Sequence, residues 1–274
     1  GLMGAALAEA AAKRGDDVVA WNRSPDKAKA LAAFGVRAAS SPKEAVAGVD
    51  RVHLMLRDDA VVDSVLADCG DLKHAVVVDH STVSPAGTVA RAQKLEERGV
   101  AFVHAPVFMS PAMCRAAGGV MIAAGARASF ERVEQALKAM TGTLRYLGER
   151  RDLAAANKLF GNAMIVSVIA GLADVYAMAH SLDISAVDAH SLFDTFNPAA
   201  GIAYRGGNMA KGDYRASFEL SMARKDVALM IETAKGAPLA LLPGVAARMD
   251  QLLARGFGDD DMGVLSVDAV KKAT

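Results

Sequence analysis

The first part of the chain alternates short Val-rich apolar runs with segments whose apolar residues recur at helical spacing. This alternation is typical of beta-alpha-beta units, in which helices connect the strands of a parallel sheet. Seven runs are predicted as strands, at residues 17–21, 36–39, 51–56, 75–79, 100–104, 120–124 and 144–146. The pattern therefore predicts an α/β domain built on a parallel sheet.

The helices between these runs are marked at their ends. Ser24-Pro25 and Ser41-Pro42 each place a hydroxyl before a proline, which is the arrangement typical of a helix N-terminus. A glycine follows the predicted end of three helices, at Gly15, Gly35 and Gly99. Glycine is favoured there because the residue after a helix often adopts a left-handed conformation.

After Leu147 the Val-rich runs stop, and Ala, Leu and Met recur at helical spacing almost to the end. Residues 152–182 contain no proline and only two glycines, so they are predicted as one helix about 45 Å long at 1.5 Å per residue. We therefore expect two domains, an α/β domain over residues 1–148 and an all-α domain over residues 149–274.

Charge and composition narrow the class of partner. The 31 Lys and Arg residues balance 31 Asp and Glu residues, so the chain has no basic field to attract nucleic acid or an anionic membrane. The longest strongly apolar stretch, residues 163–173, is shorter than the roughly 20 residues of a membrane helix, and no membrane span is expected. A small-molecule substrate fits this composition better.

The two cysteines, Cys69 and Cys114, lack the spacing of metal ligands, so no metal site is expected. Two thiols in a chain of 274 residues are typical of a reducing compartment, which predicts a cytoplasmic location. The chain opens on Gly1, without the charged and apolar segments of a signal peptide.

The first four residues, Gly1, Leu2, Met3 and Gly4, lead directly into a predicted helix. With the strand that follows, they match the second half of the G-x-G-x-x-G turn of a Rossmann-type dinucleotide domain. Glycines allow the backbone to approach the pyrophosphate, and the helix N-terminus supplies free amides. We expect a first strand and about ten residues to precede this turn. Taken alone, the four residues also fit a simple helix cap.

The end of the next predicted strand, Trp21-Asn22-Arg23-Ser24, bears on the choice of cofactor. An NAD-specific domain usually carries a carboxylate there to bind the ribose 2′-hydroxyl, and this segment has none. Arg23 can pair with a 2′-phosphate, while Asn22 and Ser24 can add hydrogen bonds. The segment predicts NADP(H) in preference to NAD(H). The alternative is that Arg23 is solvated and Ser24 only caps a helix.

Several short motifs distributed over nearly the whole chain together resemble one family. They are Gly1-Leu2-Met3-Gly4, Met55-Leu56-Arg57-Asp58-Asp59, Asp79-His80-Ser81-Thr82-Val83-Ser84-Pro85, Ala105-Pro106-Val107, Asn157-Lys158 with Asn162, and Lys225-Asp226. The chain resembles the beta-hydroxyacid dehydrogenase family, whose members include 3-hydroxyisobutyrate dehydrogenase and tartronate semialdehyde reductase, and which is related to 6-phosphogluconate dehydrogenase.

The resemblance implies that Lys158 is the catalytic acid/base and that Asn162 helps to hold the substrate. The spacing agrees with this, because residues i and i+4 lie on one face of a helix and can converge on one substrate oxygen. Such a pair by itself is most often a solvated surface pair, so these roles depend on the resemblance.

The resemblance also implies several cofactor contacts. Met55, Leu56 and Arg57 are expected on the adenosine side, and Thr82 and Lys225 are expected to contact the cofactor. Each residue has a structural alternative. Met55 and Leu56 end a buried strand, Thr82 can cap a helix, and Lys225 can pair with the carboxylate beside it.

The substrate loop departs from the family pattern. Where the family has Asp-Ala-Pro-Val-Ser-Gly-Gly, with the Ser and backbone amides binding a substrate carboxylate, this chain has His104 to Ser110 and reads Val107-Phe108-Met109 after the proline. The anion-binding role therefore does not transfer to Phe108, although Ser110 can substitute in part. His104 is predicted as a core histidine bonded to a backbone carbonyl.

We therefore predict an NADP-dependent oxidoreductase that transfers hydride between the nicotinamide and a small beta-hydroxyacid or semialdehyde. An imine reductase is one alternative, although related imine reductases usually lack a lysine at position 158. A catalytically inactive NADP-binding scaffold is another. The wide apolar stripe of the long helix predicts a homodimer or homotetramer.

Overall fold

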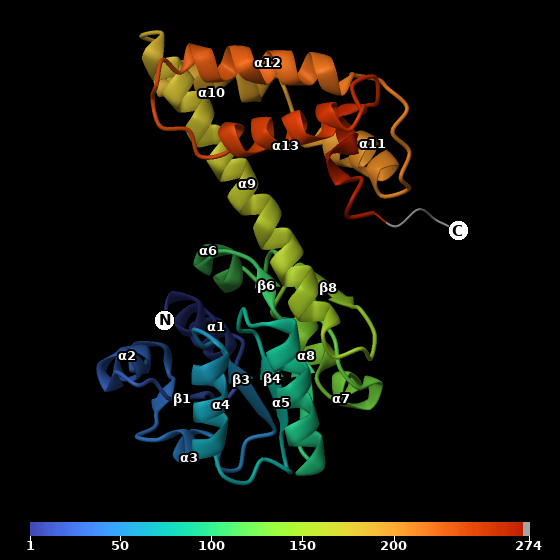
Figure 1. Cartoon of the computed structure of the whole chain (residues 1–274). Helices are drawn as coiled ribbons and strands as arrows, with labels where there is room; N and C mark the ends of the chain where they lie inside the picture. Colours follow the sequence, from blue (N-terminus) through green and yellow to red (C-terminus); the bar gives the residue numbers. More distant parts are fainter. Residues whose placement is uncertain (271–274) are drawn as a thin grey trace. The chain divides into compact units, whose positions relative to one another are not determined.

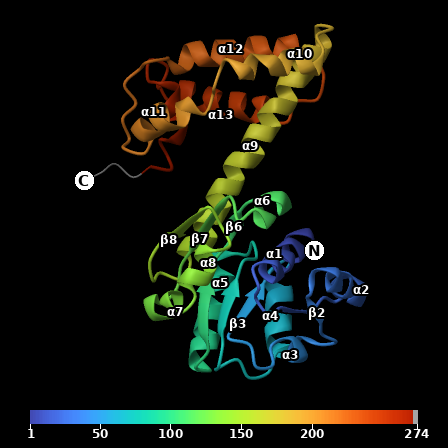
Figure 2. The same cartoon turned by 180° about the vertical axis from the view of Figure 1, so that it is seen from behind.

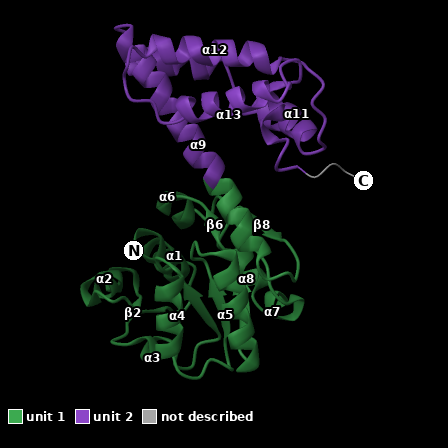
Figure 3. Cartoon of the chain, viewed as in Figure 1, with its two compact units in different colours: residues 1–162 green, residues 163–274 purple. Residues whose placement is uncertain are grey.

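The computed structural model describes residues 1–270. The chain forms two compact units, the first spanning residues 1–162 and the second beginning at Ala163 (Figure 3). The division falls inside one long helix, whereas the change in composition places it at residue 148. One continuous helix therefore contributes residues to both units.

The first unit alternates helices and strands (Figure 1). Its helical elements are α1 (Leu2–Lys13), α2 (Pro25–Lys29), η1 (Ala30–Phe34), α3 (Pro42–Ala45), α4 (Asp59–Asp68), α5 (Pro85–Glu97), α6 (Pro111–Arg115), α7 (Arg127–Glu131) and α8 (Glu134–Lys138). Its strands are β1 (Val19–Ala20), β2 (Arg37–Ala38), β3 (Arg51–Leu54), β4 (Val76–Asp79), β5 (Ala101–His104), β6 (Val107–Phe108), β7 (Val120–Ala123) and β8 (Thr143–Tyr146).

The strands pair in three groups. Parallel β3, β4 and β5 form one sheet, β1 and β2 form a parallel pair, and β6 runs antiparallel to β7, which is parallel to β8. A bridge between His104 and Ala124 joins the end of β5 to the end of β7. All seven predicted strands are confirmed, most of them shorter than predicted. β6 was not predicted, because two residues after a proline are too few to show a period.

Strand β4 lies at the centre of the first unit, with all four residues buried. Its alternate side chains enter two different cores, as the period of a strand requires. Val76 and Val78 pack with residues of α1 and α6, whereas Val77 packs with residues of α4 and α5. Helices therefore cover both faces, as in a Rossmann-type domain.

The predicted helix ends are confirmed in part. Gly15, Gly35 and Gly99 have φ values of 94°, 83° and 71°, in the left-handed region that favours glycine. Ser41 precedes α3 and accepts a hydrogen bond from the Glu44 amide. Ser24 precedes α2, but its side chain makes no capping hydrogen bond.

The second unit is helical, as predicted. It contains the rest of α9 (Leu153–Ser181) together with α10 (Ala186–His190), η2 (Ser191–Asp194), α11 (Ala200–Met209), α12 (Leu220–Thr233), α13 (Leu242–Ala254) and η3 (Met262–Ser266) (Figure 2). Buried side chains of α12, α13 and η3 form its core. The buried carboxylate of Asp174 accepts hydrogen bonds from the amides of Ala240, Leu241 and Leu242, and so fixes the N-terminus of α13.

Helix α9 confirms the predicted single long helix and has 29 residues. By length and composition alone it is also apolar enough to cross a membrane, with a mean hydropathy of 1.6 over its most apolar window. The strongly apolar stretch at residues 163–173 is only one part of this helix, and the expectation drawn from its length does not hold for the helix as a whole. One such helix is weak evidence for a membrane span, and the absence of a membrane partner stays a prediction.

Candidate active site

The predicted phosphate turn forms the start of α1. Gly1 is the residue before the helix, and the first turn contains no acidic side chain. The first amides of a helix have no partner within the helix, and its dipole favours an anion at this end. A Cβ on Gly4 would lie 3.6 Å from Cβ of Met55, so the turn packs against the segment that follows β3.

The segment after β1 presents a cation at the surface. The Asn22 side chain accepts a hydrogen bond of 2.9 Å from the Ser24 amide and so bends the backbone around Arg23. Arg23 is exposed, and the Ser24 hydroxyl is not used to cap α2. Free amides, an exposed guanidinium and a free hydroxyl are donors suited to a dinucleotide that carries a 2′-phosphate.

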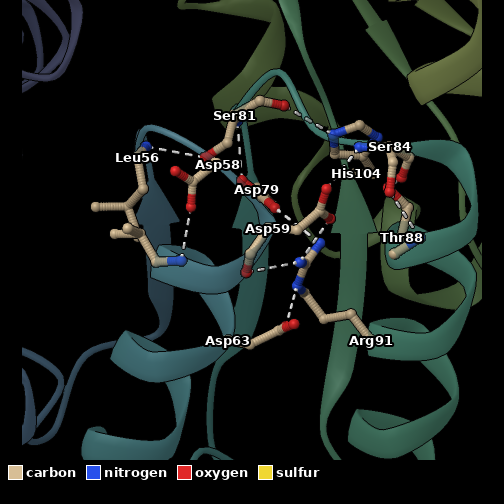
Figure 4. A network of polar contacts seen from close by, with 12 residues as sticks. Leu56, Asp58, Asp59, Asp63, Asp79, Ser81, Ser84, Thr88, Arg91 and His104 are labelled. Atoms are coloured by element: carbon tan, nitrogen blue, oxygen red, sulfur yellow. Dashed lines mark hydrogen bonds and ion pairs between the residues drawn. The ribbon is translucent and has the colours of Figure 1, made fainter.

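Two loops follow the carboxyl ends of β3 and β4 and are hydrogen-bonded to each other. The Leu56 amide donates to the Ser81 hydroxyl over 2.9 Å (Figure 4). Met55 and Leu56 are half-buried, Arg57 is exposed and pairs with Asp58, and Thr82 is exposed between two buried residues. Cofactors bind at this edge of an open parallel sheet. The structure therefore brings the predicted adenosine-side residues and Thr82 to one edge.

Behind these loops lies a buried arginine, Arg91 of α5, which is 2% exposed (Figure 4). Its guanidinium nitrogens lie 3.0 Å from Asp59, 2.7 Å from Asp63 and 3.7 Å from Asp79. Asp79 is fully buried at the end of β4. One guanidinium is therefore shared by three carboxylates, two from α4 and one from β4.

The same carboxylates hold the loop backbone. Asp59 accepts a hydrogen bond of 2.9 Å from the Ser84 amide, and Asp79 accepts one of 2.8 Å from the Ser81 amide. Partial burial acts to raise the pKa of Asp59, but hydrogen bonds from Ser84 and Arg91 hold it below the usual value. A Cβ on Gly87 would lie 2.1 Å from the Asp59 carboxylate, so glycine makes room for this contact. This network fixes the loop that carries Thr82.

Two histidines at this edge are buried and bonded to backbone. His80 Nδ1 lies 2.6 Å from the Ala105 carbonyl oxygen, and His104 Nε2 lies 3.1 Å from that of Ser81. Burial lowers the pKa of both side chains, which keeps them neutral near pH 7. The prediction that His104 is a core histidine bonded to a backbone carbonyl is confirmed.

Lys158 lies in the part of α9 that belongs to the first unit. Its ammonium donates a hydrogen bond of 2.7 Å to the Val107 carbonyl and lies 4.1 Å from the centre of the Phe108 ring. The side chain is half-buried, and burial lowers its pKa. Asn162 follows one helical turn later on the same element. The ammonium of Lys158 is therefore fixed in position by a hydrogen bond and partly desolvated, which makes it a suitable proton donor.

The altered loop is closely fitted to its surroundings. A Cβ on Gly161 would lie 2.4 Å from two atoms of the Phe108 ring. The hydroxyl of Ser110 accepts a hydrogen bond of 3.2 Å from the Met113 amide and caps α6. The sequence analysis does not single out Gly161. The available signal is a glycine inside a predicted helix, which is unfavourable unless packing requires it.

Lys225 lies on α12 in the second unit, half exposed, with its ammonium 2.9 Å from the Asp226 carboxylate. Its contact with the cofactor stays a prediction. Within residues 1–270, no cluster of three or more His, Cys, Asp or Glu side chains has an arrangement that could hold a metal ion.

Comparison with known proteins agrees with this geometry. Residues 1–148 match the NAD binding domain of 6-phosphogluconate dehydrogenase. The chain is 27% identical to the chloroplastic glyoxylate/succinic semialdehyde reductase 2 of Arabidopsis thaliana, over 100% of this chain and 78% of that protein. It is 24% identical to mitochondrial 3-hydroxyisobutyrate dehydrogenase of Mus musculus, over 95% and 82%.

A further relative is named a cytokine-like nuclear factor, N-PAC, from Drosophila melanogaster. It is 26% identical over 86% of this chain, and the chain spans only 40% of its length. Among solved structures, an imine reductase from Pseudomonas sp. has a TM-score of 0.91 at 21% identity, over 98% of this chain and 96% of the other. The imine reductase of Streptomyces aurantiacus has a TM-score of 0.90 at 24% identity, over 99% and 97%. These likenesses establish the fold.

The fold and the matched cofactor domain define an NAD(P)-dependent oxidoreductase. The chain belongs to the beta-hydroxyacid dehydrogenase family, as the motifs of its sequence predict.

Proposed function

We propose that the protein is an NADPH-dependent reductase of small carbonyl compounds. In the reverse direction, the same reaction oxidises a beta-hydroxyacid or related alcohol. The observation that carries this proposal is the position of Lys158. Its ammonium is half-buried, is held by the Val107 carbonyl, and lies on the segment of α9 that packs in the cofactor-binding unit.

The proposed reaction combines hydride transfer from the cofactor with proton transfer from Lys158. When bound, a reduced nicotinamide would supply the hydride that a carbonyl carbon accepts. Lys158 donates a proton to the carbonyl oxygen as negative charge develops there, and Asn162 orients that oxygen. Because an ammonium has three N–H groups and the Val107 carbonyl takes one, Lys158 keeps a donor for the substrate.

NADPH is proposed in preference to NADH because of the segment after β1. Arg23 is exposed, no carboxylate is present among Asn22, Arg23 and Ser24, and the Ser24 hydroxyl makes no capping bond. A guanidinium can bind a phosphate through two parallel hydrogen bonds. The predicted cofactor contacts of Gly1 to Gly4, Met55 to Arg57, Thr82 and Lys225 belong to this proposal.

The test of Lys158 is reduction of short semialdehydes and keto acids by Lys158→Met, with Lys94→Met as a control at an exposed position of α5. We expect kcat/KM to fall by roughly 10²–10⁴, the contribution of a general acid. The Kd for NADPH, measured by fluorescence titration, is expected to stay unchanged. If Lys158→Met retains wild-type turnover, the assignment of the proton donor is wrong.

Imine reduction is the second candidate, and the observation that favours it is the aromatic ring of Phe108 in the substrate loop. The solved structures that share the fold include enzymes named imine reductases. Cyclic imines tested beside the aldehydes decide between the two reactions. Turnover of imines alone would make imine reduction the first candidate and carbonyl reduction the second. NADPH binding without turnover of either class would instead favour the scaffold.

A further inference from the structure

The substrate loop of this chain contains two bulky residues, Phe108 and Met109, where the family it resembles has Ser and Gly. Such substitutions could have been accommodated at the surface without consequence. The structure instead places both residues half-buried, with Phe108 beside the predicted proton donor.

A glycine of helix α9 makes room for Phe108. A Cβ on Gly161 of α9 would lie 2.4 Å from two ring atoms of Phe108, much less than a van der Waals contact. Gly119 also lies close to Met109, but its φ of 75° already favours glycine whatever side chain is at position 109. Gly161 has a helical position at which alanine would be the more favourable residue for the helix itself. Its side of α9 is therefore shaped to receive the Phe108 ring.

Few hydrogen-bond donors lie near Lys158 in this loop. The ammonium lies 4.1 Å from the ring centre, a distance at which a cation is attracted to an aromatic face. The Val107 carbonyl takes one of its N–H groups. Ser110, the one hydroxyl of the loop, accepts a hydrogen bond from the Met113 amide at the start of α6 and has a single O–H group left to donate. A carboxylate needs several donors when it leaves water, and this loop offers them poorly.

We propose that Phe108, seated against Gly161, is a specificity-determining residue that makes the subsite beside Lys158 apolar. The enzyme then selects carbonyl substrates that carry an uncharged alkyl or aryl group where short hydroxyacids carry a carboxylate. This inference rests on the proposed carbonyl reductase function and names its substrate class. Lys158 acts on the carbonyl oxygen of such a substrate and does not bind a second, anionic group.

The test compares two aldehydes of similar length, pentanal and succinic semialdehyde, in which an ethyl group and a carboxylate occupy equivalent positions. We expect wild-type kcat/KM to favour pentanal by at least about tenfold, the discrimination typical of an apolar pocket. Phe108→Ser should reduce this ratio by about tenfold, since it removes the ring and admits water. Equal ratios in the two proteins, or a wild-type preference for succinic semialdehyde, would overturn the proposal.

A second variant moves the ring without removing it. Gly161→Ala introduces a methyl group where the ring now lies, so we expect a loss of pentanal turnover of several-fold or more with an unchanged melting temperature. Gly171→Ala is the matched control, because a Cβ at that position of α9 meets only Leu241, at 3.7 Å. Equal effects of the two substitutions would show that the ring position is unimportant.

Binding to the NADPH complex separates this inference from the proposed function. The alcohols 1-pentanol and 4-hydroxybutanoate cannot accept hydride from NADPH, so their Kd values for this complex measure the subsite without turnover. If no aldehyde is reduced but 1-pentanol binds more tightly and Phe108→Ser removes that preference, the inference stands and the reaction is wrong. If aldehydes are reduced but 4-hydroxybutanoate binds more tightly, the reaction stands and the inference fails.

Discussion

Arg23 is the residue on which the choice between the two nicotinamide cofactors depends. Replacing it by alanine removes charge-assisted hydrogen bonds to a 2′-phosphate, each worth about 1.5–3 kcal/mol. We expect the Kd for NADPH to rise by roughly tenfold or more, with the Kd for NADH little changed. Arg37→Ala is the control, since Arg37 is an exposed arginine on the adjacent strand β2. Equal losses of affinity for both cofactors would contradict a role specific to the phosphate.

Residue identities in the site were predictable to different degrees. Lys158 was found because its motif resembles that of a known family, and the structure places its ammonium against the Val107 carbonyl. That carbonyl was beyond prediction, because every residue has one and only the fold selects it. Gly161 was missed because its role depends on a ring that lies 53 positions earlier in the chain, a separation that local patterns do not report.

Helix α5 carries a buried charge, the guanidinium of Arg91. Replacing Arg91 by methionine leaves the buried Asp79 and its neighbours without their cation. Breaking a buried ion pair on one side costs about 3–5 kcal/mol, and we expect the free energy of unfolding to fall by this amount. Lys94→Met, exposed on the same helix, should change it by less than about 0.5 kcal/mol. Chemical denaturation of both variants is the measurement.

The network around Arg91 also predicts a local effect. Asp59 and Asp79 hold the amides of Ser84 and Ser81. Amide exchange in the segment after β4 should therefore accelerate in Arg91→Met more than exchange in β4 itself. Uniform acceleration throughout the unit would mean that the arginine supports the fold and not the loop.

Element types were largely predictable because strand and helix periods differ and because glycines and prolines mark the ends. Every strand predicted in the first unit is present, and one long helix was expected where α9 lies. Strand β6 could not be predicted, since its two residues become a strand only by pairing with β7. The position of the unit boundary inside α9 is likewise a property of packing and not of local sequence.

For the whole molecule, the exposed apolar side chains of α9 predict self-association. Six of them are between 50% and 67% exposed: Phe160, Met164, Ile165, Val166, Val168 and Ile169. Exposed apolar side chains that lie close together are typical of an interaction surface. We propose that a second copy of the chain covers it, in a homodimer or homotetramer.

Sedimentation velocity tests this assembly. The wild-type protein should sediment as a dimer or tetramer at micromolar concentration, and the double variant Ile165→Asp/Ile169→Asp should sediment as a monomer because buried charges oppose the contact. Gln251→Asp, at an exposed position of α13, should leave the assembly unchanged. A monomeric wild-type protein would exclude an oligomer held by this face.

The contact between Phe108 and Gly161 has a consequence for the ancestry of the chain. A residue larger than glycine at position 161 leaves no space for the ring in its present place, so we expect phenylalanine at position 108 only in chains that have glycine at position 161. Replacement of Phe108 by a smaller residue leaves a hole beside α9, and glycine at position 161 has no side chain to fill it. The two positions are thus expected to change as a pair among descendants of this gene.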